Sequence, residues 1–281
     1  AGVINVICGE RETGAALVDH PTPAMVSITG SVRAGMEIAA SAAPDLKRVH
    51  LELGGKAPVI VYDDCDFEKT VNGVAEANLY NAGQDCAAGT RVIVQEGIAK
   101  EFTAALAKKV AEFKFGAPEN DDHFYGALNS QNQLDRVQGF IDRLPSHAEI
   151  LTGGKAQRLN GGYYFEPTLI AGLKQDDEMI QTEVFASVQT IQTFKDEAQA
   201  IEMANDVDFG LAASIWSENH GKVIRTSQDL DFGQVWVNCH LVQAAEMPNG
   251  GFKHSGHGND LSTEAIEGYT RVKHIMSLTG R

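Results

Sequence analysis

The stretch from Val49 to Tyr62, VHLELGGKAPVIVY, decides how this chain folds. It holds two short apolar runs, Val49–Leu53 and Ala57–Tyr62, on either side of a glycine pair. Short runs rich in Val, Ile and Leu and bounded by glycine are typical of buried β-strands. Helical patterns alternate with such runs along the rest of the chain. We therefore predict an α/β fold with a mostly parallel sheet.

The same patterns predict the other elements. Strands are expected at Val3–Ile7, Ala24–Thr29, Val92–Gln95, Ile150–Thr152, Pro167–Ile170, Thr190–Phe194, Leu211–Trp216, Gln234–Asn238 and Val272–Leu278. Helices are expected at Ala15–Leu17, Gly30–Ala43, Asp66–Tyr80, Lys100–Lys114, Val137–Ile141, Glu197–Ala204, Gly221–Gln228 and Thr263–Tyr269. Asp66 and Ser130 are placed as helix N-caps, since short polar side chains accept hydrogen bonds from the first free N–H groups.

The composition is that of an ordinary soluble protein, with 43% hydrophobic and 22% charged residues among 281. Acidic side chains outnumber basic ones by 38 to 23, which gives a net charge of −15. Such a charge repels phosphate backbones and anionic lipid, so we expect neither nucleic acid nor a membrane as partner. No apolar run approaches the length of a bilayer span. We expect a cytoplasmic protein.

The 4 cysteines lie far apart and form no CxxC pair. This spacing is typical of neither a zinc site nor a disulfide framework. His254 and His257 lie in a glycine-rich stretch without a carboxylate or thiol pattern around them, which favours a loop. We therefore expect no metal site.

A glycine-rich turn follows the strand expected at Ala24–Thr29. The free N–H groups and the dipole of a helix N-terminus attract an anion, so a dinucleotide pyrophosphate suits this place. Plain helix capping is the alternative interpretation. The residues of the turn are Gly30, Ser31, Val32, Arg33, Ala34 and Gly35.

Glu52 and Cys86 are the candidates for chemistry. Glu52 stands between two leucines at a strand end, and an apolar setting raises the pKa of a carboxylate toward that of a general base. The alternative is a solvent-facing Glu on an alternating strand. Cys86 stands among small residues after a long helix, in a turn where backbone N–H groups would lower the thiol pKa and stabilise an oxyanion. The alternative is a buried, inert cysteine.

Leu51-Glu52-Leu53-Gly54-Gly55-Lys56, followed by Gly83-Gln84-Asp85-Cys86, resembles the paired signatures of the aldehyde dehydrogenase superfamily. The resemblance extends over essentially the whole chain, in order. Further matching motifs are Tyr164–Thr168, Glu183–Phe185, Phe209–Leu211, Trp236–Asn238 and Gly250–Gly256. It implies the aldehyde dehydrogenase fold, with a catalytic domain and part of a Rossmann-like domain that binds NAD, although NADP is not excluded.

The resemblance also implies roles. Cys86 matches the nucleophile and Glu52 the general base, while Gly30 to Gly35 match the turn that faces the cofactor phosphates. Leu53 matches the residue whose backbone approaches the nicotinamide. Glu183 matches the carboxylate that holds the nicotinamide ribose, and Phe185 matches the aromatic ring beside it. Relatives have Gly-Pro where this chain has Ala186-Ser187, which puts the orientation of Glu183 and Phe185 in doubt.

The implied reaction is the oxidation of a small-molecule aldehyde to its carboxylate. The Cys86 thiolate attacks the aldehyde, a hydride leaves for the nicotinamide, and Glu52 activates the water that hydrolyses the thioester. The motifs around Asp85 and Asn249 most resemble those of gamma-aminobutyraldehyde dehydrogenase in putrescine breakdown, and a carboxylate at Asp85 suits a cationic aminoaldehyde. Asp85 as a turn residue is an equal alternative, and betaine aldehyde or aromatic aldehydes remain alternative substrates.

Family members carry a longer N-terminal portion, so we expect an N-terminally truncated chain that binds cofactor poorly by itself. Expected divisions are 1–54 for the end of the dinucleotide-binding domain, 55–254 for the catalytic domain, and 255–281 for a return segment with the oligomerisation strand. Relatives imply a homotetramer or homodimer for the full-length form. The competing hypothesis is a short homologue that no longer catalyses and has a structural or assembly role.

Overall fold

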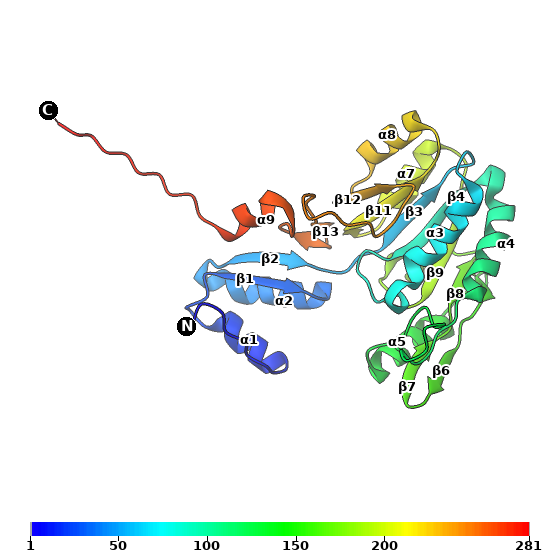
Figure 1. Ribbon diagram of the computed structural model, residues 1–281, viewed down its shortest axis with the longest axis horizontal. Coiled ribbons are helices and arrows are strands. Elements are labelled where there is room, and N and C mark those ends of the chain that lie inside the picture. Colours follow the sequence, from blue (N-terminus) through cyan, green and yellow to red (C-terminus); the bar gives the residue numbers. More distant parts are fainter. Residues whose placement is uncertain (1, 281) are drawn as a thin grey trace.

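The computed structural model describes residues 2 to 280, and its two larger β-sheets lie side by side (Figure 1). The larger sheet has 7 strands in the order β12-β11-β3-β4-β9-β8-β5. All neighbouring pairs are parallel except β5 with β8. Its strands are β3 (Ala57–Val61), β4 (Gly89–Gln95), β5 (Glu149–Thr152), β8 (Thr168–Ala171), β9 (Val188–Phe194), β11 (Ala212–Trp216) and β12 (Gln234–Val237). The predicted mostly parallel α/β fold is confirmed.

Helices cover both faces of this sheet, which explains why β3 is apolar at every position. Val59 and Val61 belong to the core with α3 (Phe67–Leu79), α4 (Glu96–Glu112) and α5 (Gln131–Asp142). Ile60 belongs to the core on the other face, with α7 (Glu197–Asn205) and α8 (His220–Asp229). The chain also forms α6 (Glu178–Gln181) and the short 3₁₀ turns η1 (Ala43–Asp45) and η2 (Tyr80–Gly83). None of the helices within residues 2–280 is both long and apolar enough to cross a membrane.

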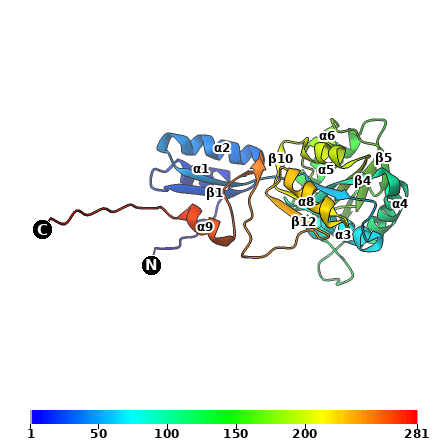
Figure 2. The ribbon, with the colours of Figure 1, turned by 90° about the horizontal axis from the view of Figure 1, so that it is seen from above.

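The smaller sheet has 3 strands in the order β1-β2-β14. β1 (Met25–Thr29) runs parallel to β2 (Arg48–Glu52), and β14 (Gly256–His257) returns antiparallel on the other side of β2. The helices near this sheet are α1 (Arg11–Asp19), α2 (Val32–Ala42) and α9 (Ser262–Tyr269) (Figure 2). Asp66 and Ser130 cap α3 and α5 as predicted.

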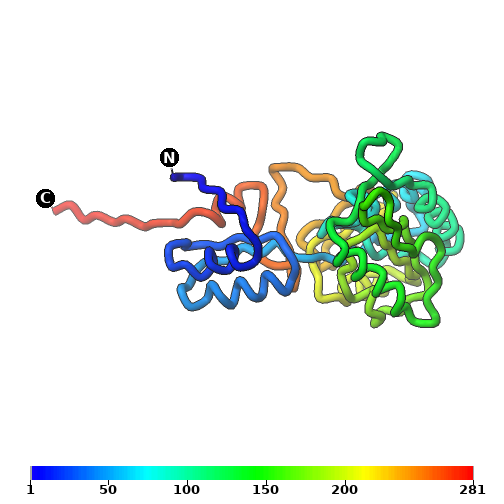
Figure 3. The backbone as a smooth tube through the Cα atoms, turned by 90° about the horizontal axis from the view of Figure 1, so that it is seen from below, coloured from blue at the N-terminus to red at the C-terminus, as the bar shows by residue number. Residues whose placement is uncertain are grey.

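Two predicted strands are wrong. Residues 3–7 and 272–278 have no regular secondary structure, and their large apolar side chains are exposed. A strand needs a neighbour for its N–H and C=O groups, and neither run pairs with a strand in the described chain. The segment after α9 extends away from the molecule, and both ends of the chain lie on the side of the smaller sheet (Figure 3).

The sequence analysis missed one hairpin. β6 (Ala156–Leu159) and β7 (Gly162–Phe165) pair antiparallel. Their connection, Asn160-Gly161, has φ of 50° and 82°, the left-handed backbone that suits a two-residue hairpin turn. The Asn-Gly pair was therefore the available signal. A second small antiparallel pair joins β10 (Phe209–Gly210) to β13 (Phe252–Lys253).

The connection from β2 to β3 passes from the smaller sheet to the larger one (Figure 1). The domain boundary expected after residue 54 falls in this connection, and that expected after 254 falls between β13 and β14. The division into domains stays a prediction.

Candidate active site

Two glycines in the β2–β3 connection let three segments of backbone meet. A methyl group on Gly55 would lie 2.0 Å from the carbonyl oxygen of Cys86. One on Gly54 would lie 2.5 Å from a carboxylate oxygen of Glu183. Side chains at these positions would push the segments apart. The end of β2, the turn that holds Cys86 and the segment around Glu183 therefore converge here.

The turn that holds Cys86 follows the end of α3 and has a tightly constrained backbone. Asn81, Ala82 and Gly83 have φ of 50°, 59° and 70°. Gly83 is required, because a methyl group there would lie 2.0 Å from the carbonyl oxygen of Ala186. This backbone leaves Cys86 partly exposed, so the alternative of a sealed, inert thiol is not what the structure has.

Cys86 lines a cleft of about 1040 Å³. Both residues predicted to contact substrate, Asp85 and Asn249, line the same cleft. Its wall also includes Phe124, Trp216 and His240. Neither Glu52 nor Glu183 is among the lining residues of this cleft, and Glu183 lies against Gly54 of the glycine connection.

The expected lowering of the Cys86 pKa is wrong. Burial, followed by the charges of Asp85, Glu183 and Glu52 in that order, raises the pKa of the thiol to about 12. A backbone hydrogen bond opposes this rise but is the smallest contribution. The three carboxylates were predicted as site residues, but burial and their charges outweigh the nearby N–H groups. The thiol is protonated at neutral pH and needs a base to become a nucleophile.

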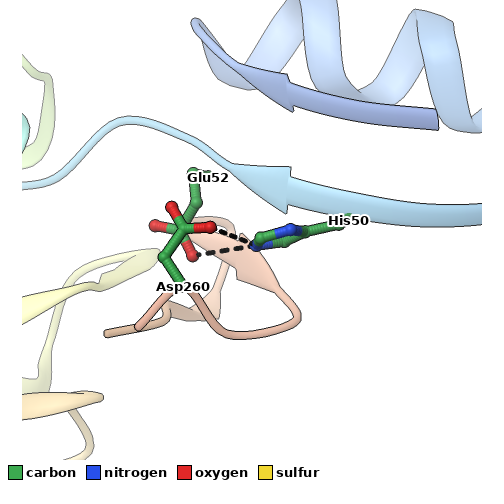
Figure 4. A group of neighbouring side chains, drawn as sticks. All are labelled: His50, Glu52 and Asp260. Carbon is green, nitrogen blue, oxygen red and sulfur yellow. Dashed lines mark hydrogen bonds and ion pairs between the residues drawn. The ribbon is translucent and has the colours of Figure 1, made fainter. Parts of the chain in front are cut away.

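The carboxylate of Glu52 has the properties of such a base. Glu52 is only 5% exposed, so the alternative of a solvent-facing residue is wrong. Burial, followed by the charge of Asp260, raises its pKa to about 7. The Oε1 atom of Glu52 lies 3.5 Å from Nε2 of His50, which in turn lies 3.7 Å from a carboxylate oxygen of Asp260 (Figure 4).

Side chains of α5 donate hydrogen bonds to the backbone of Glu183 and Phe185. Arg136 donates hydrogen bonds of 2.6 and 2.7 Å to the carbonyls of Glu183 and Val184, and Gln133 donates one of 2.8 Å to that of Phe185. The Glu183 carboxylate accepts the N–H of Gly55 at 3.0 Å. Burial raises the pKa of Glu183, while this N–H opposes the rise. These bonds direct Glu183 toward the glycine connection despite the Ala186-Ser187 departure.

The turn from Gly30 to Gly35 opens α2 beside the end of β2. Ser31 caps the helix by accepting the N–H of Ala34 at 3.2 Å, and the N–H of Gly30 donates to the carbonyl of Glu52 at 2.9 Å. A methyl group on Gly35 would lie 2.6 Å from the Leu53 side chain, so this glycine lets Leu53 pack against α2. The helix N-terminus and Glu52 are therefore neighbours.

The sequence analysis missed four residues at this site. Lys56 and His240 are buried, with the pKa of Lys56 lowered by burial to about 7 and that of His240 to about 4. The neutral His240 ring bridges the carbonyl of Ala87 and the Ser214 hydroxyl at 2.8 and 2.9 Å. His50 and Asp260 adjoin Glu52. Alternation on β2 was a signal for His50, since residues two apart share a face, but nothing local marked Asp260 or His240.

Asp260 lies beside Glu52 and also pairs with Asn249, which lines the cleft. Its backbone exchanges two hydrogen bonds with that of Asn249, at 2.9 and 2.7 Å. β14 lies beside β2 just before this pair, with Gly256 opposite Glu52. The site therefore has a nucleophilic thiol in an open cleft, a buried carboxylate that is half ionised near neutral pH, and a helix N-terminus. Such a set suits covalent catalysis with base-assisted hydrolysis.

Comparison with known proteins gives the family. Residues 1–275 match the model of the Aldehyde dehydrogenase family, and the chain belongs to this family. It is 41% identical over 278 residues to a protein named aldehyde dehydrogenase from Emericella nidulans, a match that covers 98% of this chain and 56% of that protein.

Solved structures agree in fold. One is an NAD-dependent aldehyde dehydrogenase from Sinorhizobium meliloti, with a TM-score of 0.94 and 36% identity over 96% of this chain and 54% of that one. Another is a mutant betaine aldehyde dehydrogenase from Staphylococcus aureus in complex with NAD⁺, with a TM-score of 0.91 and 36% identity over 93% of this chain and 54% of that one. The chain thus spans about half the length of these relatives and has the aldehyde dehydrogenase fold over that span.

The raised pKa of Glu52 predicts a pH-dependent stability difference. The folded-state pKa of about 7 exceeds the ordinary 4.5, so the wild-type chain loses stability as pH rises through this interval and the buried carboxyl ionises. Glu52→Gln has no such loss. Between pH 5 and pH 8 the variant is expected to gain about 2 kcal/mol relative to wild type.

Urea unfolding at both pH values, with a chelator present, measures this difference. Glu178→Gln, at an exposed ion pair with Arg143, is the control and is expected to show no comparable change with pH. A constant difference between Glu52→Gln and wild type would show that Glu52 is not held in a desolvated site.

Proposed function

We propose that this protein oxidises an aldehyde to its carboxylate with NAD, with Cys86 as nucleophile and Glu52 as general base. The observation that carries the proposal is the convergence of the Cys86 turn with the end of β2, where Glu52 has a pKa of about 7 and adds to the negative field at the thiol. Family membership supports the same chemistry.

The reaction begins at the thiol. Glu52 in its ionised form accepts the thiol proton, directly or through a water, and the Cys86 sulfur adds to the aldehyde carbon to give a thiohemiacetal. The main-chain N–H of Cys86 contributes to holding the oxyanion. Loss of hydride from that carbon then leaves a thioester on Cys86.

Hydrolysis completes the cycle. Glu52 first releases the thiol proton to solvent and then removes a proton from a water. The hydroxide adds to the thioester carbonyl, and the C–S bond breaks to release the carboxylic acid and the Cys86 thiolate, which takes the proton back from Glu52. A pKa of about 7 suits both roles, because the carboxylate accepts a proton readily and also returns it near neutral pH. Burial, together with the charges of Asp85, Glu183 and Glu52, keeps free Cys86 protonated, which protects the resting thiol from oxidation.

The residues present fit NAD. The α2 N-terminus, with its cap on Ser31, offers N–H groups to the pyrophosphate, and Glu183 offers a carboxylate beside the glycine connection for a ribose hydroxyl. We assign Phe185, which is close to Glu183 in the chain, to pack beside the cofactor. We assign the backbone of Leu53 to lie near the nicotinamide. NAD when bound accepts the hydride. The NAD⁺ complex of the Staphylococcus aureus relative supports this assignment, while NADP stays an alternative.

We propose a cationic aldehyde as substrate, with 4-aminobutanal as the first candidate. The carboxylates of Asp85 and Glu76 both line the cleft, with Lys69 as the opposing charge. The Asp85 carboxylate also accepts a hydrogen bond of 2.7 Å from the N–H of Ala87. Asp85 therefore stabilises the turn in addition to any contact that it makes with substrate. Asn249 adds a polar group to the wall. Betaine aldehyde, equally cationic, is the alternative that the Staphylococcus aureus relative supports.

We also propose a homodimer or homotetramer. The segment from Val272 to Leu278 is extended and exposes Val272, Ile275, Met276 and Leu278 at 77% to 102% of their full surfaces. A second copy would supply the strand neighbour and the apolar cover that this segment needs.

Hydrolysis of an activated ester, such as 4-nitrophenyl acetate, tests the nucleophile and the base without a hydride acceptor. We expect the chain to hydrolyse the ester, Cys86→Ser to lose on the order of a thousandfold in rate, and Glu52→Gln to accumulate the acylated Cys86, visible in the intact mass, with release slowed about a hundredfold or more. Cys239→Ser is the matched control, since Cys239 also lines the cleft.

The alternative hypothesis, a homologue with only a structural role, predicts that Cys86→Ser and wild type acylate equally slowly. Wild-type turnover of aldehyde with NAD, followed by NADH absorbance, is the complementary assay. Acylation at Cys86 without NADH production would support the thiol and base but not the cofactor assignment.

The substrate proposal is tested by Asp85→Asn. If Asp85 attracts the ammonium group, kcat/KM for 4-aminobutanal falls about tenfold, equivalent to about 1.4 kcal/mol, while kcat/KM for pentanal changes little. Equal effects on the two aldehydes would leave Asp85 with its turn role alone. Equal kcat/KM values for the two aldehydes with the wild type would remove the preference for a cation.

A further inference from the structure

We propose that His50, Glu52 and Asp260 form a binding site for a divalent transition-metal ion such as Zn²⁺. His50 and Glu52 come from the same face of β2, and Asp260 comes from the segment that follows β14 (Figure 4). One ligand atom from each of the three lies within 4.8 Å of the other two. Imidazole nitrogen with two carboxylate oxygens is a donor set that Zn²⁺ accepts, with a fourth place for water.

The spacing of the ligand atoms fits a tetrahedral ion. Nε2 of His50 lies 3.5 Å from Oε1 of Glu52 and 3.7 Å from Oδ1 of Asp260. Bonds of about 2.0–2.2 Å to Zn²⁺ place tetrahedral ligands about 3.3–3.5 Å apart. The three atoms therefore need movements of a few tenths of an ångström to about one ångström, and Asp260, whose side chain is 47% exposed, is free to make the largest.

A buried carboxylate directed into this cluster without a close donor is the second observation. The Glu52 side chain is 6% exposed and that of His50 is 3%. Charge-assisted hydrogen bonds between nitrogen and carboxylate are about 2.7–2.9 Å long, so the contact of 3.5 Å between these two residues is a weak one. Within the described chain, His50 provides the one hydrogen bond found for the Glu52 carboxylate. A cation would satisfy it.

The surroundings of His50 orient the ring as in metal sites. Nδ1 lies 3.1 Å from the hydroxyl of Tyr269 and 3.3 Å from that of Ser27. Donation of the Nδ1 proton to either oxygen leaves the Nε2 lone pair directed at the two carboxylates, the tautomer that a metal ligand requires. The ring also packs edge-on against Tyr269, and Gly258 is required beside it, because a methyl group there would lie 2.5 Å from Cδ2 of His50.

Occupancy would change what Glu52 does. A carboxylate bound to the ion cannot accept a proton from Cys86 or water, so the ion and the base function exclude each other. Binding itself does not depend on the proposed oxidation, whereas this inhibitory effect rests on it. The exposed position of Asp260 gives the ion access from solvent without passing through the cleft.

Zn²⁺ titration of the chelator-treated full chain by calorimetry, without aldehyde or NAD, tests the site separately from the proposed function. Thiols are competing ligands, so the titration uses a chain with Cys8, Cys65, Cys86 and Cys239 all replaced by Ser. We expect one ion per chain, and at least tenfold weaker binding for His50→Gln and for Asp260→Asn. Co²⁺ added to the same cysteine-free chain is expected to give visible bands that weaken in Asp260→Asn.

His147→Gln is the matched control, because His147 makes a surface pair of 2.8 Å with Asp177, a histidine–carboxylate contact for which no third ligand is found. Its affinity for Zn²⁺ is expected to equal that of the parent. Asp260→Asn keeps the test decisive if the buried His50 variant fails to fold, since Asp260 is half exposed. Unchanged binding in Asp260→Asn, absence of binding in the parent, or Co²⁺ bands that are the same in Asp260→Asn and the parent would overturn the proposal.

Discussion

The site depends on the close passage of backbone at Gly54 and Gly55. In the described chain, the backbone at these two glycines lies against the Cys86 carbonyl and the Glu183 carboxylate, which occupy the space that side chains would otherwise fill. Two further contacts stabilise this arrangement. Gly83 leaves room for the carbonyl of Ala186, and Arg136 of α5 donates hydrogen bonds to the carbonyls of Glu183 and Val184. The two sheets are thereby joined at the residues on which the proposed chemistry depends.

Crowded negative charge is the electrostatic result of this packing. The thiol of Cys86 has the charges of Asp85, Glu183 and Glu52 acting on it, and the Glu52 carboxyl has that of Asp260. Each group is thus held closer to its neutral form than it would be in water. A positive charge that arrives among these carboxylates, whether from an aminoaldehyde, an oxidised nicotinamide or a metal ion, finds a favourable field. Cations therefore have a common physical reason to bind in this part of the molecule.

The sequence predicted most of the fold because its strands are short apolar runs and its helices have polar caps such as Asp66 and Ser130. It failed at residues 3–7 and 272–278, where apolar patterns are not matched by a neighbouring strand in the described chain. Glu52 and Cys86 were predicted as site residues from their local setting together with a family resemblance, and their catalytic roles stay a proposal. The direction of the Cys86 pKa was wrong because burial, its largest cause, depends on tertiary packing, and the charge of the neighbouring Asp85 was not taken into account. Asp260 and His240 were missed because their places in the site depend on contacts between residues far apart in the chain, which no local pattern records.

The central claim is that the Cys86 sulfur and the Glu52 carboxylate share one electrostatic environment. A nitrile placed on Cys86 by cyanylation, in a chain whose other cysteines are serine, measures this directly, because its stretching frequency reports the local field. The account predicts a frequency change with a midpoint near pH 7 that disappears in Glu52→Gln. A frequency that does not change with pH in the parent chain, or one that changes identically in Glu52→Gln, would contradict it.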